Sequence, residues 1–237
     1  MSVLVVTGTG TGVGKTVVTA AVAALAAARG SSVAVVKPAQ TGVAAGEPGD
    51  LDDVRRLAGV TELHELARFP DPLSPAAAAR RSGLPPLDVA ACVETVRGLA
   101  EARDLVVVEG AGGLLVRYDD EGATLADVAR ELTADVLVVV DPALGTLNHT
   151  ALTLEAMAHR GLTLAGVVIG SWPERPDLAC RSNVRDLETL AARPLAGALP
   201  AGAGGLDAAE FLLVARSGLA PALGGVFDAA DFRRDHH

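Results

Sequence analysis

The sequence predicts a single α/β domain, residues 1–237, in which a mostly parallel central sheet is flanked by helices on both faces. Three observations predict this class. A short apolar strand, an alanine-rich helix and a second strand follow one another within about 35 residues, the order of a βαβ unit. Further apolar runs then alternate with helical stretches. No internal repeat and no long linker divides the chain.

Each expected element has a local reason. The strands are short runs of apolar, mostly β-branched residues, expected at 3–6, 32–36, 104–108, 136–140 and 164–169. The helices are rich in alanine and leucine, begin near a capping residue or proline and end near glycine; we expect them at 17–29, 51–58, from 75, from 85 to about 103, and at 146–160, 177–191 and 207–216. The tail, residues 218–237, shows no convincing pattern.

Composition and charge exclude several functions. Half of the residues are apolar but only 3% are aromatic, so the core must consist mainly of Ala, Val and Leu. The net charge of −9 argues against a nucleic-acid binder, which needs a basic face. Two cysteines give neither a disulfide framework nor a metal motif. With no leader, and no apolar run near the roughly 20 residues of a membrane helix, we expect a cytoplasmic protein without a membrane contact.

Residues 8–16, Gly-Thr-Gly-Thr-Gly-Val-Gly-Lys-Thr, predict a phosphate-binding loop. The stretch lies between a strand and a helix, where backbone N–H groups and the helix N-terminus attract an anion. Lys15 can reach the outer phosphates, and the Thr16 hydroxyl can hold Mg²⁺. The spacing departs from G-x-x-x-x-G-K-[ST], because Thr9 stands where that pattern has a glycine. The motif indicates a P-loop NTPase-like fold.

Two charged residues end buried strands on the same edge of the predicted sheet. Lys37 follows the strand at 32–36, and Glu109 follows the strand at 104–108 and precedes Gly110-Ala111-Gly112-Gly113. Ligands of parallel sheets bind beyond the carboxyl ends of the strands, where the phosphate loop also lies. Glu109 therefore occupies a Walker-B-like position, and Lys37 is a candidate for stabilising charge on a transferred phosphoryl group.

Asp50 has two expected roles. It precedes the helix at 51–58 and can act as its N-cap, or its carboxylate can reach Mg²⁺, and the two roles can coexist. Thr16, Asp50 and Glu109 would then supply oxygen ligands, while phosphates and waters complete the coordination. Lys15 and Lys37 would be the catalytic cations. The residues alone thus predict a Mg²⁺-dependent enzyme or switch that uses a nucleoside triphosphate, and they do not define its second substrate.

The ordered set of motifs closely resembles the dethiobiotin synthetase family. The resemblance rests on residues 6–16, on Lys37-Pro38 with Thr41, on residues 108–113 and on residues 144–149, and it extends to about residue 202. It implies an ATP- and Mg²⁺-dependent ligase of biotin biosynthesis. Such an enzyme captures CO₂ on 7,8-diaminononanoate as a carbamate, phosphorylates the carbamate to a carbamic–phosphoric anhydride, and closes a cyclic urea with release of ADP and phosphate.

The resemblance also implies roles for individual residues. It assigns the nucleotide to Gly12, Val13, Gly14, Lys15, Thr16, Val17, Asp50, Glu109, Gly110, Ala111 and Gly112. It assigns the diamine to Thr11, Lys37, Thr41, Gly113, Leu144, Gly145, Thr146 and Asn148. The helix start at 145–148 resembles the segment that receives the substrate carboxylate from the neighbouring subunit, which implies a homodimer.

One position departs from the pattern of this family. Many members carry an asparagine after the strand at 164–169, where its amide reads the adenine edge, and here that position is Gly170. We therefore expect base contacts from backbone groups of Gly170, Ser171, Pro200, Ala201 and Gly202, and weaker selection of ATP over CTP or GTP.

Two alternatives remain at this point. A related ATP-dependent ligase, such as one acting on a corrinoid, would usually need an added glutaminase domain, for which 237 residues leave little room. A partitioning or positioning ATPase of the Min and Par type would typically carry a lysine early in its phosphate loop. Residues 8–12 contain none, which favours the synthetase.

Overall fold

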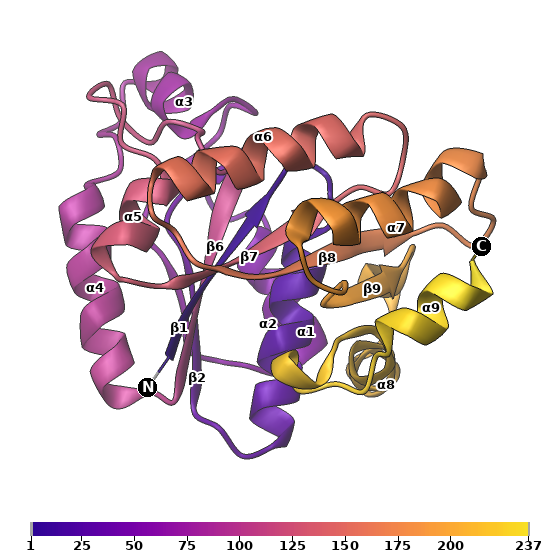
Figure 1. Cartoon of the computed structure of the whole chain (residues 1–237). Helices are drawn as coiled ribbons and strands as arrows, with labels where there is room; N and C mark the ends of the chain where they lie inside the picture. Colours follow the sequence, from indigo (N-terminus) through magenta and orange to yellow (C-terminus); the bar gives the residue numbers. More distant parts are fainter. Residues whose placement is uncertain (1, 237) are drawn as a thin grey trace.

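A computed structural model describes residues 2–236 and contains a seven-stranded parallel sheet (Figure 1). The strand order is β4-β2-β6-β1-β7-β8-β9, and each neighbouring pair runs parallel. The strands are β1 (Ser2–Gly8), β2 (Val33–Lys37), β4 (Leu63–Glu65), β6 (Leu105–Gly113), β7 (Asp135–Val140), β8 (Leu164–Trp172) and β9 (Gly197–Pro200). The predicted α/β class with a parallel sheet is confirmed.

Helices cover both faces of the sheet, as predicted. One face packs against α1 (Lys15–Ala28), α2 (Asp50–Ala58) and α8 (Ala208–Gly218). The opposite face packs against α3 (Pro75–Ser82), α4 (Val89–Ala102), α5 (Leu125–Glu131), α6 (Thr146–His159), α7 (Leu178–Ala191) and α9 (Ala229–Asp235). Alternation along the strands divides the core: Leu4 and Val6 face the first layer, whereas Val5 faces the second.

The helix starts show which local signals were correct. Pro75 is the first residue of α3, as expected. Asp177, expected as the first helical residue, instead caps α7 and accepts a hydrogen bond from Cys180 N. The N-cap assigned to Asp50 was wrong. Gly49 is the N-cap of α2, and Asp50 is its first helical residue. The carboxylate that turns back to accept from Gly49 N is that of Asp52, which leaves Asp50 directed toward the site.

The sequence analysis missed several elements. It left out α5 and a separate two-stranded sheet of β3 (Gln40–Thr41) and β5 (Arg68–Phe69). The tail that showed no pattern contains a 3₁₀ turn at Pro221–Leu223 and the helix α9, which lies beside the C-terminal end of the chain in Figure 1. Among residues 2–236, no helix combines the length and apolarity needed to cross a membrane.

Candidate functional site

The phosphate loop forms at the carboxyl end of β1, the central strand of the site. Its turn depends on Gly12 and Gly14, which have φ of 78° and 93°. Gly14 is also closely packed, since a Cβ there would lie 2.6 Å from the Gly170 carbonyl oxygen. The helix α1 begins at Lys15, so its unpaired N–H groups face the loop. Lys15 Nζ donates to the Gly10 carbonyl at 2.9 Å, which folds this amine over the loop.

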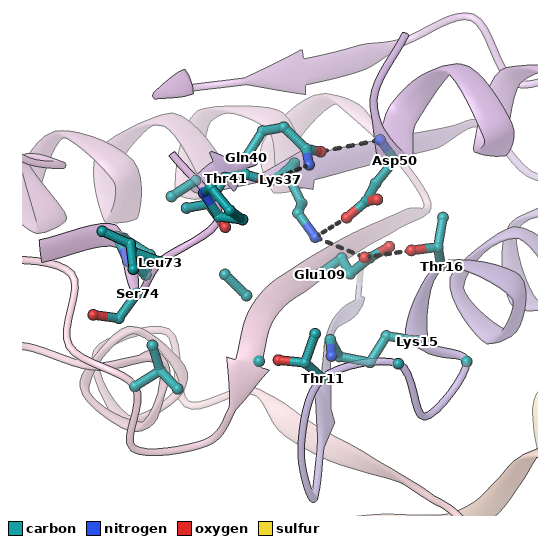
Figure 2. Close-up of a pocket in the computed structure, with 18 of the residues that line it drawn as sticks. Thr11, Lys15, Thr16, Lys37, Gln40, Thr41, Asp50, Leu73, Ser74 and Glu109 are labelled. Carbon is teal, nitrogen blue, oxygen red and sulfur yellow. Dashed lines mark hydrogen bonds and ion pairs between the residues drawn. The ribbon is translucent and has the colours of Figure 1, made fainter. Parts of the chain in front are cut away.

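Lys37, Glu109, Asp50 and Thr16 form one connected polar cluster beside the loop (Figure 2). Lys37 Nζ donates to Glu109 Oε1 at 2.8 Å, to the Gly110 carbonyl at 3.3 Å and to the Asp50 carboxylate. Thr16 Oγ1 donates to the same Glu109 oxygen at 2.9 Å. Lys37 and Glu109 are buried, with 2% and 0% exposure. The three neighbouring strands β2, β6 and β1 thus bring together the residues predicted to share one sheet edge.

The environment shifts the pKa values of Lys15 and Lys37 in opposite directions. Burial alone would lower the pKa of Lys37, but the Glu109 and Asp50 carboxylates outweigh burial and raise it. Burial lowers the pKa of Lys15, and repulsion from Lys37 lowers it further. Counting Lys15 with the cluster, two ammonium groups face two carboxylates, so their formal charges cancel. The printed sequence contains no other lysine, a signal that sequence reasoning overlooked.

Gln40 holds the N-terminus of α2 in place. Its Oε1 accepts from Asp50 N at 3.0 Å, its Nε2 donates to the Thr41 carbonyl at 3.3 Å, and the residue is 5% exposed. Arg68 supports the same loop, because its guanidinium donates to the Ala44 and Glu47 carbonyls. These contacts place the Asp50 carboxylate next to Lys37. Sequence analysis missed Gln40 as a site residue, although it lies three positions after Lys37.

A cavity of about 620 Å³ opens from the phosphate loop. Many predicted residues line it: Thr11, Gly12, Gly14, Lys15, Thr16, Val17, Lys37, Thr41, Asp50, Glu109, Ala111 and Gly112. One part of the lining is largely apolar, and sequence analysis did not foresee it. It consists of Ala39, Pro72, Leu73, Ser74, Pro75 and Val116. Figure 2 shows Leu73 and Ser74 on the side of the pocket away from Lys15 and Thr16. The pairing of β3 with β5 brings residues 72–75 opposite Thr41, and this pairing had no clear signal in the sequence.

Other predicted residues do not line this cavity. Gly170 lies beneath the phosphate loop, where a Cβ would come within 2.0 Å of the Val13 carbonyl oxygen. Ser171 lies near the end of β8. Pro200 is the last residue of β9, and Ala201 and Gly202 follow it. Leu144 is 89% exposed and precedes α6, whose N-cap Gly145 has φ of 98°. Their roles stay predictions.

The oxygen atoms of the cluster fit a magnesium ion. Glu109 Oε2 is buried and has no hydrogen-bond partner within residues 2–236, so a cation would satisfy it. Thr16 Oγ1 and the Asp50 carboxylate lie around the same Glu109–Lys37 pair. Magnesium prefers such oxygen ligands and retains several waters, so two carboxylates and a hydroxyl are enough protein ligands for it. Within the described chain, no group of three or more His, Cys, Asp or Glu offers another metal site.

The loop, the lysine behind it and the buried acid on the adjacent strand define a P-loop nucleotide-binding protein. A family model described as an AAA domain matches residues 2–204. The chain is 69% identical to the ATP-dependent dethiobiotin synthetase BioD of Parafrankia sp. (strain EAN1pec), over 99% of this chain and 98% of that protein. The enzyme of the same name from Streptomyces coelicolor is 57% identical, over 100% and 99%. The chain belongs to the ATP-dependent dethiobiotin synthetase family.

Solved structures with a similar fold have distant sequences. The septum site-determining protein MinD of Pyrococcus horikoshii, complexed with Mg-ADP, aligns with a TM-score of 0.55 at 16% identity, covering 89% of this chain and 88% of that chain. Chloroplast FtsY from Physcomitrella patens aligns with a TM-score of 0.51 at 20% identity, covering 90% of this chain and 64% of that chain. These similarities support the P-loop fold alone.

Proposed function

We propose that the protein closes the cyclic urea of dethiobiotin from 7,8-diaminononanoate, CO₂ and ATP, with ADP and phosphate as co-products. One observation carries the proposal. The buried Lys37 ammonium lies where the phosphate loop meets a cavity whose far wall is apolar. A carbamate placed beside Lys37 would therefore face the γ-phosphate, while its aliphatic chain extends along the apolar wall.

Different residues of the chain would then carry out different steps of the reaction. The backbone N–H groups of the loop and Lys15 hold the phosphates and stabilise charge that develops on the transferred γ-phosphoryl group. Lys37 attracts and orients the carbamate anion, whose oxygen attacks phosphorus as ADP leaves. The second amine then attacks the carbamoyl carbon and expels phosphate. Thr16, Asp50 and Glu109 would hold Mg²⁺, which neutralises phosphate charge when it is bound.

The apolar wall explains how the diamine is oriented. Pro72, Leu73 and Val116 can cover the aliphatic chain, whereas Thr11 and Thr41 offer hydroxyls near its amines. Gly113 lies next to the loop, where a Cβ would be 3.5 Å from the Gly8 carbonyl oxygen. Pro72 and Leu73 are solvent-exposed, so they would exclude water and protect an anhydride intermediate from hydrolysis once the aliphatic chain packs against them.

We propose that the functional unit is a homodimer. The α6 start, with Leu144, Gly145, Thr146 and Asn148, would receive the substrate carboxylate of the neighbouring subunit. One support is the exposure of Leu144 at this helix start. Another is Thr146 Oγ1, which is buried at the helix N-terminus and has no hydrogen-bond partner among residues 2–236. We also propose a cytoplasmic setting, where the buried thiols Cys92 and Cys180 stay reduced.

We propose that the nucleotide base lies against Gly170, Ser171 and the Pro200–Gly202 segment. No side-chain amide is present at position 170, so recognition would depend on backbone groups. Backbone contacts distinguish bases less strictly, and CTP or GTP should therefore replace ATP with a modest loss. Steady-state rates with each triphosphate test this, and strong selection of adenine would contradict it.

Turnover experiments test the reaction itself. Release of phosphate from ATP should require both the diamine and bicarbonate, and carbon from labelled bicarbonate should enter the organic product in equal amount to ADP. Phosphate release that ignores the diamine would instead indicate a nucleotide-switched ATPase of the Min and Par type. Gel filtration with light scattering would test the dimer.

A further inference from the structure

The end of the chain builds an aromatic cluster around Trp172, the single tryptophan. The Trp172 and Phe232 rings meet edge to face, with centroids 5.0 Å apart and an interplanar angle of 69°. His236 lies 4.9 Å from Trp172, and Phe227 lies 5.3 Å from Phe232. Trp172 is 7% exposed, and its Nε1 has no hydrogen-bond partner in the described part of the chain. Packing against α9 therefore fixes the indole.

The backbone of Trp172 joins the two segments proposed to hold the base. Its carbonyl accepts from Ala201 N at 2.7 Å, and it pairs with Pro200 across β8 and β9. The register shifts between Ile169 and Trp172, so the strand bulges at Gly170 and Ser171 and turns the indole to the α7 and α9 side. A movement of the indole would thus move both base-binding segments.

The helix α9 is itself held at a fixed place. Asp228 caps it by accepting from Ala230 N at 2.8 Å and Asp231 N at 3.0 Å. Arg233 forms an ion pair with Glu188 of α7, and Glu188 also accepts from Leu195 N at 3.1 Å, just before β9. A helix that shows no role in the phosphate site is therefore connected to both strands that flank the proposed base site.

We propose that α9 is a positioning element for the nucleotide base, and that Phe232 acts through Trp172 as its positioning residue. The proposal rests on the proposed location of the base, and it adds that the C-terminal helix sets base affinity while the phosphate loop sets phosphate affinity. Gly170 packs beneath Val13 and Gly14, so the proposed base site adjoins the phosphate loop. The contacts of α9 given above are with Trp172, with Glu188 and with its own cap, and none of these is a loop residue. A change in α9 should therefore affect the base more than the phosphates.

Fluorescence of Trp172 tests the proposal in the wild-type full chain. Adding ATP or CTP with Mg²⁺ should change the emission of this single indole, because the base orders the segments attached to it. Tripolyphosphate with Mg²⁺ occupies the phosphate loop without a base and should change the emission much less than the nucleotides do. An equal response to tripolyphosphate and to the nucleotides, or no response to any of them, would overturn the proposal.

Variants separate positioning from a general loss of structure. Phe232→Ala should raise the Kd and KM for ATP and CTP by about three- to tenfold, the range of one aromatic pair. Tripolyphosphate affinity and kcat at saturating nucleotide should stay within about twofold of wild type. Arg234→Ala, an exposed change on the same helix, is the matched control. Should Phe232→Ala fail to fold, Phe232→Leu keeps apolar volume and removes only the ring.

The outcomes also distinguish this proposal from the proposed function. Unchanged nucleotide affinity in Phe232→Ala, or an equal loss for tripolyphosphate and nucleotide, would contradict a positioning role for α9. If the wild-type protein gave the expected nucleotide responses but no diamine-dependent turnover, only the proposed reaction would be contradicted.

Discussion

Replacing Lys37 with methionine should destabilise the protein as well as abolish ring closure. Methionine keeps most of the side-chain volume but removes the ammonium that pairs with Glu109 at 2.8 Å. The side chains of Lys37 and Glu109 are 3% and 0% exposed, so the Glu109 carboxylate would remain buried without its counter-ion. Breaking such a pair on one side costs about 3–5 kcal/mol. For a chain of this size, that corresponds to a fall in Tm of about 6–20 °C.

Chemical denaturation measures this loss, and a second substitution tests its cause. In Lys37→Met/Glu109→Gln neither member of the buried Lys37–Glu109 pair is charged, so much of the lost unfolding free energy should return although activity stays absent. Lys37→Met with wild-type stability would refute the view that the pair is buried and charged. A double variant no more stable than Lys37→Met would refute the unpaired carboxylate as the cause.

The contribution of the Lys37 ion pairs to the free energy of unfolding should depend on pH. The folded-state pKa of Lys37 lies above its unfolded value, so its ion pairs contribute their full stability below about pH 10.4, the unfolded value. That contribution is lost as the pH rises through the folded pKa. The difference in unfolding free energy between wild type and Lys37→Met should therefore shrink at strongly alkaline pH.

Two further substitutions and one titration test other parts of the site. Gly170→Ala places a Cβ 2.0 Å from the Val13 carbonyl oxygen. The crowding should lower the free energy of unfolding by about 1–3 kcal/mol and raise the KM for every triphosphate. An unchanged KM would contradict the contact. Lysine-labelled protein should give two side-chain NMR titrations, Lys15 below and Lys37 above the ordinary value, and coincident curves would oppose this. Gln40→Leu should cost about 1 kcal/mol and weaken Mg²⁺-nucleotide binding, whereas unaltered binding would count against it.

Local sequence signals predicted the sheet edge well, for a physical reason. The apolar runs predicted as strands lead into Lys37 and Glu109, as expected, but both residues belong to their strands: β2 ends at Lys37, and β6 continues through Glu109 to Gly113. Parallel strands then bring those ends to one edge whatever their order. The polar cluster around Glu109 followed from these two rules together with the loop motif.

Long-range pairing and packing were beyond the reach of the sequence. The two-residue strands β3 and β5 are too short to show alternation, yet their pairing delivers Leu73 and Ser74 to the cavity. In the tail, Phe227 and Phe232 show no helical stripe of their own, since α9 is seven residues long and is stabilised by Trp172. Only the capping role expected of Asp50 was wrong: Gly49 is the N-cap of α2, and the Asp52 carboxylate accepts from its N–H.

The source of one oxygen atom in the released phosphate tests the central claim most directly. If a carbamate beside Lys37 attacks the γ-phosphate, one oxygen of CO₂ becomes the bridging oxygen of the anhydride and leaves with phosphate at ring closure. A short incubation of the full chain with ATP, the diamine and ¹⁸O-labelled CO₂ should therefore yield phosphate carrying one ¹⁸O atom per turnover. Phosphate whose new oxygen comes only from water would show that the site hydrolyses ATP, and would contradict the account.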